Sequence, residues 1–165
     1  MPPCRLPPSA SVRVTPLRID CPPGVLLRGL ARYREPAVLE SSARHDSLGR
    51  YTLLACEPPA AMRLDDDRLT DAAGRTLAAG DEAIWAVLAD AFAAARVTDR
   101  RHLAYLPGWI GYLGYELGRR VERLPGRAPR DTRLPDARVA WYDAILLYDA
   151  ADRSWRLVEL VCDDP

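Results

Sequence analysis

Apolar residues recur at spacings of three and four in two stretches of the chain, which is the period of an amphipathic helix. The first stretch follows Pro22-Pro23-Gly24 and ends before Pro36, since proline is tolerated in a first helical turn and ends a later one. Its apolar stripe consists of Leu26, Leu27, Leu30 and Tyr33. The second stretch, Asp81 to Arg96, predicts the clearest helix, with one face formed by Ile84, Trp85, Leu88, Phe92 and Ala95.

Shorter apolar or alternating runs, bounded by polar and proline-rich segments, predict strands. They cover residues 11–19, 37–41, 50–56 and 61–64, with a further strand after a turn at Asp65-Asp66-Asp67. Two longer runs, 137–148 and 154–161, flank a polar segment at 149–153 and predict an antiparallel hairpin. Strands joined by hairpins and interspersed with two helices indicate an α+β fold rather than a parallel sheet.

Composition and charge exclude several classes of function. Hydrophobic residues make up 48% of the 165 residues, and 23 basic residues balance 23 acidic ones. The formal net charge of +0 gives no general attraction for nucleic acid or anionic lipid. All 23 basic residues are arginine, and there is no lysine. Schiff-base formation and P-loop phosphate binding both require a lysine, so this chain by itself performs neither.

The cysteines and the apolar runs bear on location. The four cysteines have neither the CxxC spacing of a zinc site nor the pattern of a disulfide framework: Cys4, Cys21, Cys56 and Cys162. No signal-peptide core follows Met1, and no apolar run approaches the roughly 18 residues of a membrane span. We therefore expect reduced thiols in a cytoplasmic protein with no membrane partner.

Two polar clusters could carry chemistry, but each favours an ordinary structural role. His45 and Asp46 are adjacent and could act as an acid–base pair. No nucleophile is placed near them, so a solvated pair is the favoured interpretation. Asp65-Asp66-Asp67 could ligate a cation, but the glycine and the distant glutamate of a calcium loop are missing. A solvated hairpin turn is favoured there.

Glycines recur at positions 108, 111, 114 and 118, interleaved with aromatic residues. The spacing is not G-x-G-x-x-G, and no lysine follows, so a phosphate cradle is disfavoured. Glycine at every third residue suits a strand that another backbone approaches closely. The arginines of this region could form an anion patch, although acidic neighbours are near enough to neutralise it; the residues are Arg119, Arg120, Arg123, Glu116 and Glu122.

Three stretches, taken together, resemble the motifs of one enzyme family. The first is Val38-Leu39-Glu40-Ser41-Ser42 with Gly49-Arg50-Tyr51-Thr52 and Glu57-Pro58, which is similar to an L-E-S … G-R-Y-S … P block. The second, from Gly108 to Glu122 and on to Leu124-Pro125, contains Gly-Tyr-Glu-Leu-Gly-Arg-Arg-Val-Glu. The third is Leu134-Pro135-Asp136-Ala137, leading into Trp141-Tyr142-Asp143.

These stretches resemble the amino-terminal domain of the anthranilate synthase component I and aminodeoxychorismate (para-aminobenzoate) synthase component I family. They follow the family order over residues 12 to 162, and the second is similar to the para-aminobenzoate branch. Three positions depart from the family pattern. Ala104-Tyr105 stands where a Pro-Phe pair is usual, Pro107-Gly108 where two glycines are usual, and Glu116 where an aspartate is usual.

The resemblance implies an α+β fold with antiparallel sheets packed orthogonally and helices outside. The Pro- and Ser-rich composition of residues 1–11 predicts a flexible tail, and the resemblance implies one domain over 12–165. The family's second domain holds the chorismate pocket, magnesium-binding glutamates and a catalytic lysine, and we expect it to be absent here. We therefore expect no catalytic residue and no cofactor in this chain. The implied partners are that chorismate-binding domain and a glutamine amidotransferase subunit.

The implied function is a non-catalytic part of a synthase that replaces the 4-hydroxyl of chorismate by ammonia, giving 4-amino-4-deoxychorismate for folate. One alternative is a part of anthranilate synthase, which aminates the 2-position. Another is a stand-alone module that binds tryptophan or another amino acid, and a third is a truncated reading frame without a function of its own.

The resemblance also implies part of a tryptophan pocket. Glu40 and Ser41 match the family motif, and the far wall matches Leu48, Arg50, Tyr51 and Thr52. Glu40 or Ser41 could hold an ammonium group, Leu48 and Tyr51 could flank an indole, and Arg50 could anchor a carboxylate. The strand ending at Ser41 and the strand beginning at Arg50 should then lie side by side. The alternative is a surface loop that binds no ligand.

Overall fold

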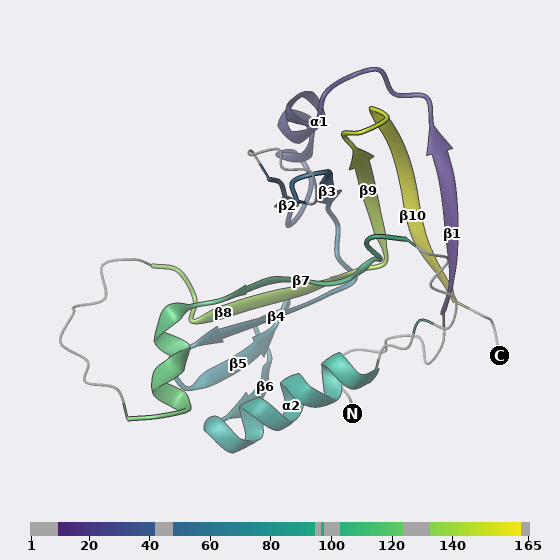
Figure 1. The fold of residues 1–165 in the computed structure, drawn as a ribbon. Coiled ribbons are helices and arrows are strands. Elements are labelled where there is room, and N and C mark those ends of the chain that lie inside the picture. Colours follow the sequence, from purple (N-terminus) through teal and green to yellow (C-terminus); the bar gives the residue numbers. More distant parts are fainter. Residues whose placement is uncertain (1–9, 42–47, 95–96, 98–102, 124–132, 163–165) are drawn as a thin grey trace. The chain divides into compact units, whose positions relative to one another are not determined.

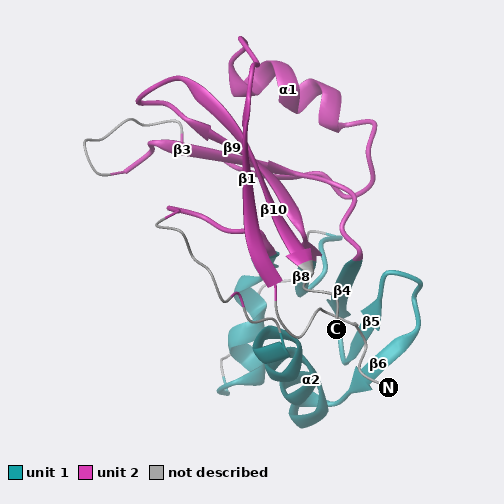
Figure 2. Cartoon of the chain, turned by 90° about the vertical axis from the view of Figure 1, so that its right-hand side faces the viewer, with its two compact units in different colours: residues 1–5, 60–94, 109–140 teal, residues 6–59, 95–108, 141–165 magenta. Residues whose placement is uncertain are grey.

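The computed structural model describes residues 10–41, 48–94, 97, 103–123 and 133–162. The chain divides into two compact units (Figure 2). Unit 1 comprises Ala60–Ala94 and Trp109–Ala140, with Met1–Arg5. Unit 2 comprises Leu6–Pro59, Ala95–Gly108 and Trp141–Pro165. Each unit contains one five-stranded sheet and one α-helix (Figure 1), so the predicted α+β class is confirmed. The predicted orthogonal packing of the sheets stays a prediction.

The sheet of unit 1 has the strand order β6-β5-β4-β8-β7, with two strands that reach just into unit 2. Its strands are β4 (Ala60–Asp65), β5 (Arg68–Asp71), β6 (Thr76–Ala79), β7 (Gly108–Leu113) and β8 (Ala137–Tyr142). The β4–β5 and β5–β6 pairs are antiparallel. The expected hairpin at the three aspartates is confirmed, with Asp65 opposite Arg68. Asp66 adopts φ 47°, the left-handed conformation that aspartate tolerates in tight turns.

Helix α2 (Asp81–Ala94) covers this sheet. Ile84, Leu88 and Ala91 are buried in a core with side chains of the sheet, among them Leu64 and Leu69. The predicted face was wrong at Phe92, which is 45% exposed, although its ring packs edge-on against Trp109 at 5.7 Å. Asp81 and Glu82 in the first turn suit the positive end of the helix dipole. Ala95 and Arg96 lie outside the described residues.

The glycine-rich run forms edge strand β7 and the 3-10 helix η1 (Tyr115–Arg120). The predicted close approach of another backbone is confirmed at two glycines. A Cβ on Gly111 would overlap the carbonyl oxygen of Arg138 and lie 2.6 Å from Cα of Val139. A Cβ on Gly114 would lie 2.7 Å from the carbonyl oxygen of Asp136, which accepts the Gly114 N–H at 2.7 Å. Because these two glycines have no Cβ, β7 and the residue after it can lie close to the backbone of residues 136–139, where β8 begins.

The sheet of unit 2 has the strand order β1-β10-β9-β3-β2, with every neighbouring pair antiparallel. Its strands are β1 (Ala10–Leu17), β2 (Ala37–Leu39), β3 (Tyr51–Ala55), β9 (Ala144–Asp149) and β10 (Ser154–Cys162). Ala10 and Ser11, expected in a tail, pair with Cys162 and Val161. Residues 1–9 of that tail lie outside the described residues. Pro16 is accommodated because β1 is an edge strand.

Helix α1 (Pro23–Leu30) packs on one face of this sheet, with Leu30 buried against Leu54, Tyr148 and Trp155. The expectation that this helix continues to Pro36 is wrong. It ends at Leu30, and the N–H of Tyr33 bonds the Leu30 carbonyl in a turn. The turn leaves Tyr33 half exposed instead of on the apolar stripe. Within the described residues, no helix has the length and apolarity needed to cross a membrane.

The long β-rich run before the last turn divides at Asp143. Its first half, β8, belongs to the sheet with β4 and β7, and its second half, β9, belongs to the sheet with β3 and β10. The predicted hairpin is therefore correct for β9 and β10 and wrong for residues 137–142. Both halves are largely buried, and a continuous apolar pattern does not show which sheet each half joins.

Candidate functional site

The predicted site residues lie at the ends of β2 and β3. These strands pair antiparallel, with Leu39 opposite Leu53, so the expected side-by-side arrangement is confirmed. Strand β2 ends at Leu39, two residues earlier than predicted, and β3 begins at Tyr51. Glu40 and Ser41 are exposed just beyond β2. Leu48 is 70% exposed, and residues 42–47 of the connecting loop lie outside the described residues.

Strand alternation separates Tyr51 from Thr52. Thr52 lies opposite Tyr148 and is 7% exposed, on the face of the sheet that packs against α1. Tyr51 lies opposite Asp149 on the other face. Because adjacent residues of a strand face opposite sides, the structure does not bring Thr52 into one surface with Tyr51. A binding role for Thr52 therefore stays a prediction.

Arg50 forms a two-pronged ion pair with Asp149. Its Nε and Nη2 each donate to one carboxylate oxygen of Asp149 at 2.7 Å. The Asp149 side chain is 2% exposed and the Arg50 side chain 52%. The backbone supports the pair, since the N–H of Ala151 donates to Asp149 Oδ1 at 3.1 Å and the N–H of Ala150 donates to the Arg50 carbonyl at 2.9 Å. Arg50 thus fastens the start of β3 to the end of β9.

The ion pair shifts both pKa values in the direction that favours the charged forms. Hydrogen bonding to Asp149 raises the pKa of the Arg50 guanidinium further above its ordinary value. Hydrogen bonding from Arg50 lowers the pKa of Asp149, against the opposing effect of burial. Sequence reasoning missed Asp149, which it assigned to a turn 99 residues away from Arg50. The signal in the sequence that could have indicated this role was the position of Asp149, a polar residue at the end of a largely apolar run.

The Tyr51 ring contacts both a cation and a second aromatic ring. The Arg50 Cζ lies 5.0 Å from the centroid of the Tyr51 ring, within the range of a cation–π contact. The ring of Tyr105 meets that of Tyr51 edge to face at 5.7 Å and 73°. Tyr105 is 46% exposed. No periodic pattern in the sequence marks Tyr105, which lies on the irregular segment before β7.

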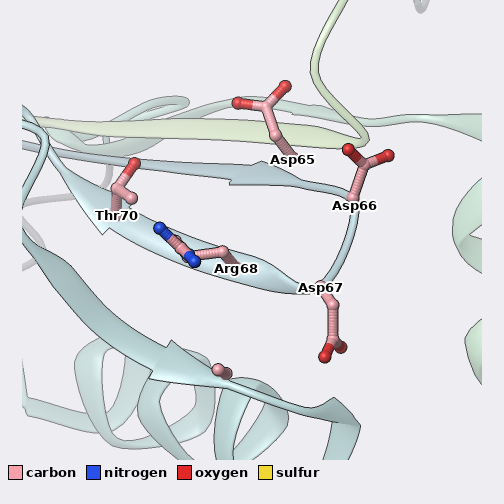
Figure 3. Close-up of a pocket in the computed structure, with 6 residues that line it drawn as sticks. Asp65, Asp66, Asp67, Arg68 and Thr70 are labelled. Atoms are coloured by element: carbon pink, nitrogen blue, oxygen red, sulfur yellow. The ribbon is translucent and has the colours of Figure 1, made fainter.

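The aspartate turn belongs to unit 1, whereas Arg50, Tyr51 and Tyr105 belong to unit 2. Asp65, Asp66, Asp67, Arg68 and Thr70 line an open pocket at the β4–β5 hairpin (Figure 3). The Asp66 and Asp67 carboxylates point in opposite directions. Among the described residues, no three His, Cys, Asp or Glu side chains are grouped to hold a metal ion.

Arg120 of the glycine-rich run is a structural residue. Its Nη1 lies 2.5 Å from Asp81 and 3.4 Å from Asp67, and its Nη2 lies 3.7 Å from Asp136. The side chain is only 15% exposed. The expected solvated face is thus wrong for Arg120, whose partners come from α2, the β4–β5 turn and the approach to β8. The expected solvated face is correct for Arg119, which pairs with Glu116 at 2.5 Å on the surface.

Removing the Arg50 guanidinium should make stability less dependent on acid pH. The folded pKa of Asp149 is lowered, so the ion pair stabilises the fold above the ordinary carboxyl value of about 4 and is lost as pH falls through the lower folded value. We expect Arg50→Met to be less stable than the parent chain at pH 7, and the difference to shrink toward pH 2. Thermal unfolding at a series of pH values from 7 to 2 measures this difference in stability between the variant and the parent chain.

The matched control for that prediction is Arg13→Met, because Arg13 pairs with Glu159 at 3.3 Å with both side chains partly exposed. An exposed pair of this kind contributes little, so this variant should follow the parent at every pH. A constant difference between Arg50→Met and the parent from pH 7 to pH 2 would contradict the role assigned to the pair.

Comparison with solved structures identifies the fold. Anthranilate synthase component I from Streptococcus pneumoniae TIGR4 superposes with a TM-score of 0.54 at 19% identity, over 72% of this chain and 26% of that one. The chain therefore has the anthranilate synthase component I-like fold. No protein-family profile matches the sequence.

Comparison with characterised proteins then narrows the resemblance to aminodeoxychorismate synthase component 1. The Klebsiella aerogenes protein of that name is 47% identical over 64 residues, which are 39% of this chain and 14% of that protein. The Escherichia coli K12 protein is 44% identical over 54 residues, 33% of this chain and 12% of that protein. The family resemblance drawn from the sequence motifs is confirmed. The matched stretches span a small part of these relatives.

Proposed function

We propose that this chain is the amino-terminal, non-catalytic part of an aminodeoxychorismate synthase component I. The observation that carries the proposal is the 47% identity to the Klebsiella aerogenes protein, in a chain with the anthranilate synthase component I-like fold. The complete enzyme would replace the 4-hydroxyl of chorismate by ammonia from a glutamine amidotransferase subunit. The product, 4-amino-4-deoxychorismate, would lead to para-aminobenzoate and folate in the cytoplasm.

The glycine-rich run supports a scaffold role in that enzyme rather than a catalytic one. Because Gly111 and Gly114 have no Cβ, they leave room for the backbone of residues 136–139 of the same chain. Arg120 is paired with three aspartates. These groups are occupied in holding β7 and η1 to unit 1, so they present no reactive atom. Chorismate and magnesium would be bound by a second domain outside this chain.

The residues at the start of β3 would form one side of a tryptophan-like pocket in the same protein. An aromatic ring, a guanidinium and an exposed carboxylate lie within a few residues of the β2–β3 ends: Tyr51, Arg50 and Glu40. A pocket completed by another domain would leave this chain with weak affinity. We expect tryptophan to bind the isolated chain with a Kd on the order of millimolar, or about 4 kcal/mol.

The 165-residue chain alone should not aminate chorismate, with ammonia or with glutamine, in the presence or absence of magnesium. No lysine is available to it, and its described residues contain no metal-binding group. Liquid chromatography with mass detection of aminodeoxychorismate measures this. Product formed at a rate proportional to chain concentration would contradict the non-catalytic assignment.

A chimera tests the positive half of the proposal. The chain is substituted for the corresponding amino-terminal part of the Klebsiella aerogenes protein, and ammonia-dependent amination of chorismate is assayed. We expect the chimera to be active, and the same chimera carrying Gly111→Val to be inactive because β7 can no longer lie against β8. An inactive chimera that folds and binds chorismate would remove the proposed function.

A further inference from the structure

The exposed side of helix α1 carries positive charge that its neighbours do not balance. No acidic residue occurs in 21–34, the segment that contains this helix. Arg34 is paired with Glu57 at 2.9 Å. Arg28 and Arg32 are both exposed, and they form no ion pair within the described part of the chain. Two guanidinium groups of this surface therefore remain available to carboxylates from outside.

Helix α2 has the opposite charge. No basic residue occurs in 76–95, the segment that contains this helix. Asp81 is paired with Arg120. Glu82 and Asp90 are exposed, and neither forms an ion pair among the residues that the structure describes. The chain has equal numbers of acidic and basic residues, so its zero net charge results from opposite charges on separate elements.

The two free carboxylates of α2 border a face made of small side chains. Glu82, Ala86 and Asp90 follow one another at intervals of four, so they share one side of the helix. Ala89 and Ala93 are exposed on the same side. Because alanine extends no further than a methyl group, the backbone of another helix can approach closely between the two carboxylates.

The exposed face of α1 has a complementary pattern. Gly24, Leu27 and Arg28 are exposed one turn apart, and Ala31 and Arg32 follow directly after the helix. Leu27 is 36% exposed, an apolar side chain beside two guanidinium groups. An apolar strip bordered by arginines fits an apolar strip bordered by carboxylates, because one contact then buries the apolar groups and pairs the charges.

We propose that α1 of one copy of this chain binds α2 of a second copy, with Arg28 and Arg32 paired to Glu82 and Asp90. The two carboxylates are about 12 Å apart along the helix axis, which two long side chains one helical turn apart can span. A second copy is the partner because this chain carries both halves of the contact and leaves both without ion pairs. The inference does not depend on the proposed function.

Sedimentation velocity of the 165-residue chain tests the association. Exposed ion pairs are weak and are screened by salt. We expect the weight-average mass to rise with chain concentration at about 20 mM sodium chloride and to stay near that of the monomer at about 500 mM. A chain that remains monomeric at about 1 mM concentration and low salt would overturn the inference.

Charge reversal on either helix tests the residues named. Arg28→Glu with Arg32→Glu, and separately Glu82→Arg with Asp90→Arg, should each raise the dissociation constant at least about tenfold. An equimolar mixture of the two double variants should associate again, because each variant then meets helices of opposite charge on the other. A mixture that stays monomeric would overturn the proposed pairing.

The matched control is Arg123→Glu with Arg133→Glu, which changes the net charge by as much as the α1 variant. Both arginines are exposed in unit 1 and lie on neither helix. This control should associate like the parent chain, and all variants should keep its circular dichroism spectrum because every substitution is at an exposed position. Association lost equally in the control, or retained in all three double variants, would place the contact on another surface and overturn the inference.

Discussion

Replacing Gly111 by alanine is expected to destabilise unit 1 by about 3 kcal/mol or more, the upper range for overpacking a well-packed site. The added methyl group would overlap the Arg138 carbonyl oxygen, and its next nearest neighbours are also backbone atoms. Backbone atoms of a central strand cannot turn aside as the end of a flexible side chain can. This overlap can be relieved only if β7 moves away from β8. Chemical denaturation followed by circular dichroism measures the loss.

Gly29→Ala is the matched control. Gly29 lies in α1, and a Cβ there meets no atom within 4 Å. Alanine should therefore be neutral or stabilise the helix by up to about 1 kcal/mol, because glycine is the poorer helix former. Equal stability of Gly111→Ala and the parent chain would mean that β7 does not approach β8 as described.

Trp155→Ala should cost about 3–5 kcal/mol, the range for removing a buried tryptophan. Trp155 is 1% exposed and packs against Tyr148 at 4.9 Å between ring centroids. Its indole N–H donates to the Cys21 carbonyl at 2.9 Å, which fastens the segment before α1 to β10. The substitution removes the largest side chain from the core beneath α1 and opens a cavity there. Thermal and denaturant unfolding measure the change.

Trp155→Phe separates the ring from the hydrogen bond. It keeps most of the apolar volume and leaves the Cys21 carbonyl without the indole donor, so we expect a cost of about 1–2 kcal/mol. If phenylalanine and alanine destabilise the chain equally, the contribution of Trp155 lies in the hydrogen bond rather than in packing.

Local patterns were sufficient for most elements of the fold. The period of Ile84, Leu88 and their neighbours predicts α2, because one face of a helix must meet the core. The β4–β5 and β9–β10 hairpins follow from polar turns between apolar runs. The glycines at 111 and 114 predict a close backbone approach because only glycine leaves room for it. Each inference needs only residues close together in the chain.

Long-range partners could not be obtained in this way. The division of the β-rich run at Asp143 depends on which strand meets each half, and both halves are equally apolar. Arg120 looked like a surface charge because its aspartate partners, Asp67 and Asp81, lie 53 and 39 residues away. A sequence shows the charges of such residues but not their distances.

The candidate site shows the same limit. The neighbouring positions of β2 and β3 were predictable because a short loop joins them and reverses the chain. Asp149 and Tyr105 reach Arg50 and Tyr51 from segments 99 and 54 residues further along the chain. Neither segment carries a pattern that names its partner, so the groups that set the charge and the aromatic surface of the site came only from the structure.

The division of the β8–β9 run at Asp143 also governs when the chain can fold during its synthesis. Strand β8 lies between β4 and β7, and β9 lies between β10 and β3. A nascent chain that has emerged only as far as Asp136 therefore lacks β8, an inner strand of one sheet, and β9, an inner strand of the other. Strand β1 also has no pairing partner at that point, because it pairs with β10. Neither unit can close as its own residues leave the ribosome. Both sheets gain their missing inner strands only when residues 137–162 have emerged, and until then the apolar strands made earlier have incomplete pairing.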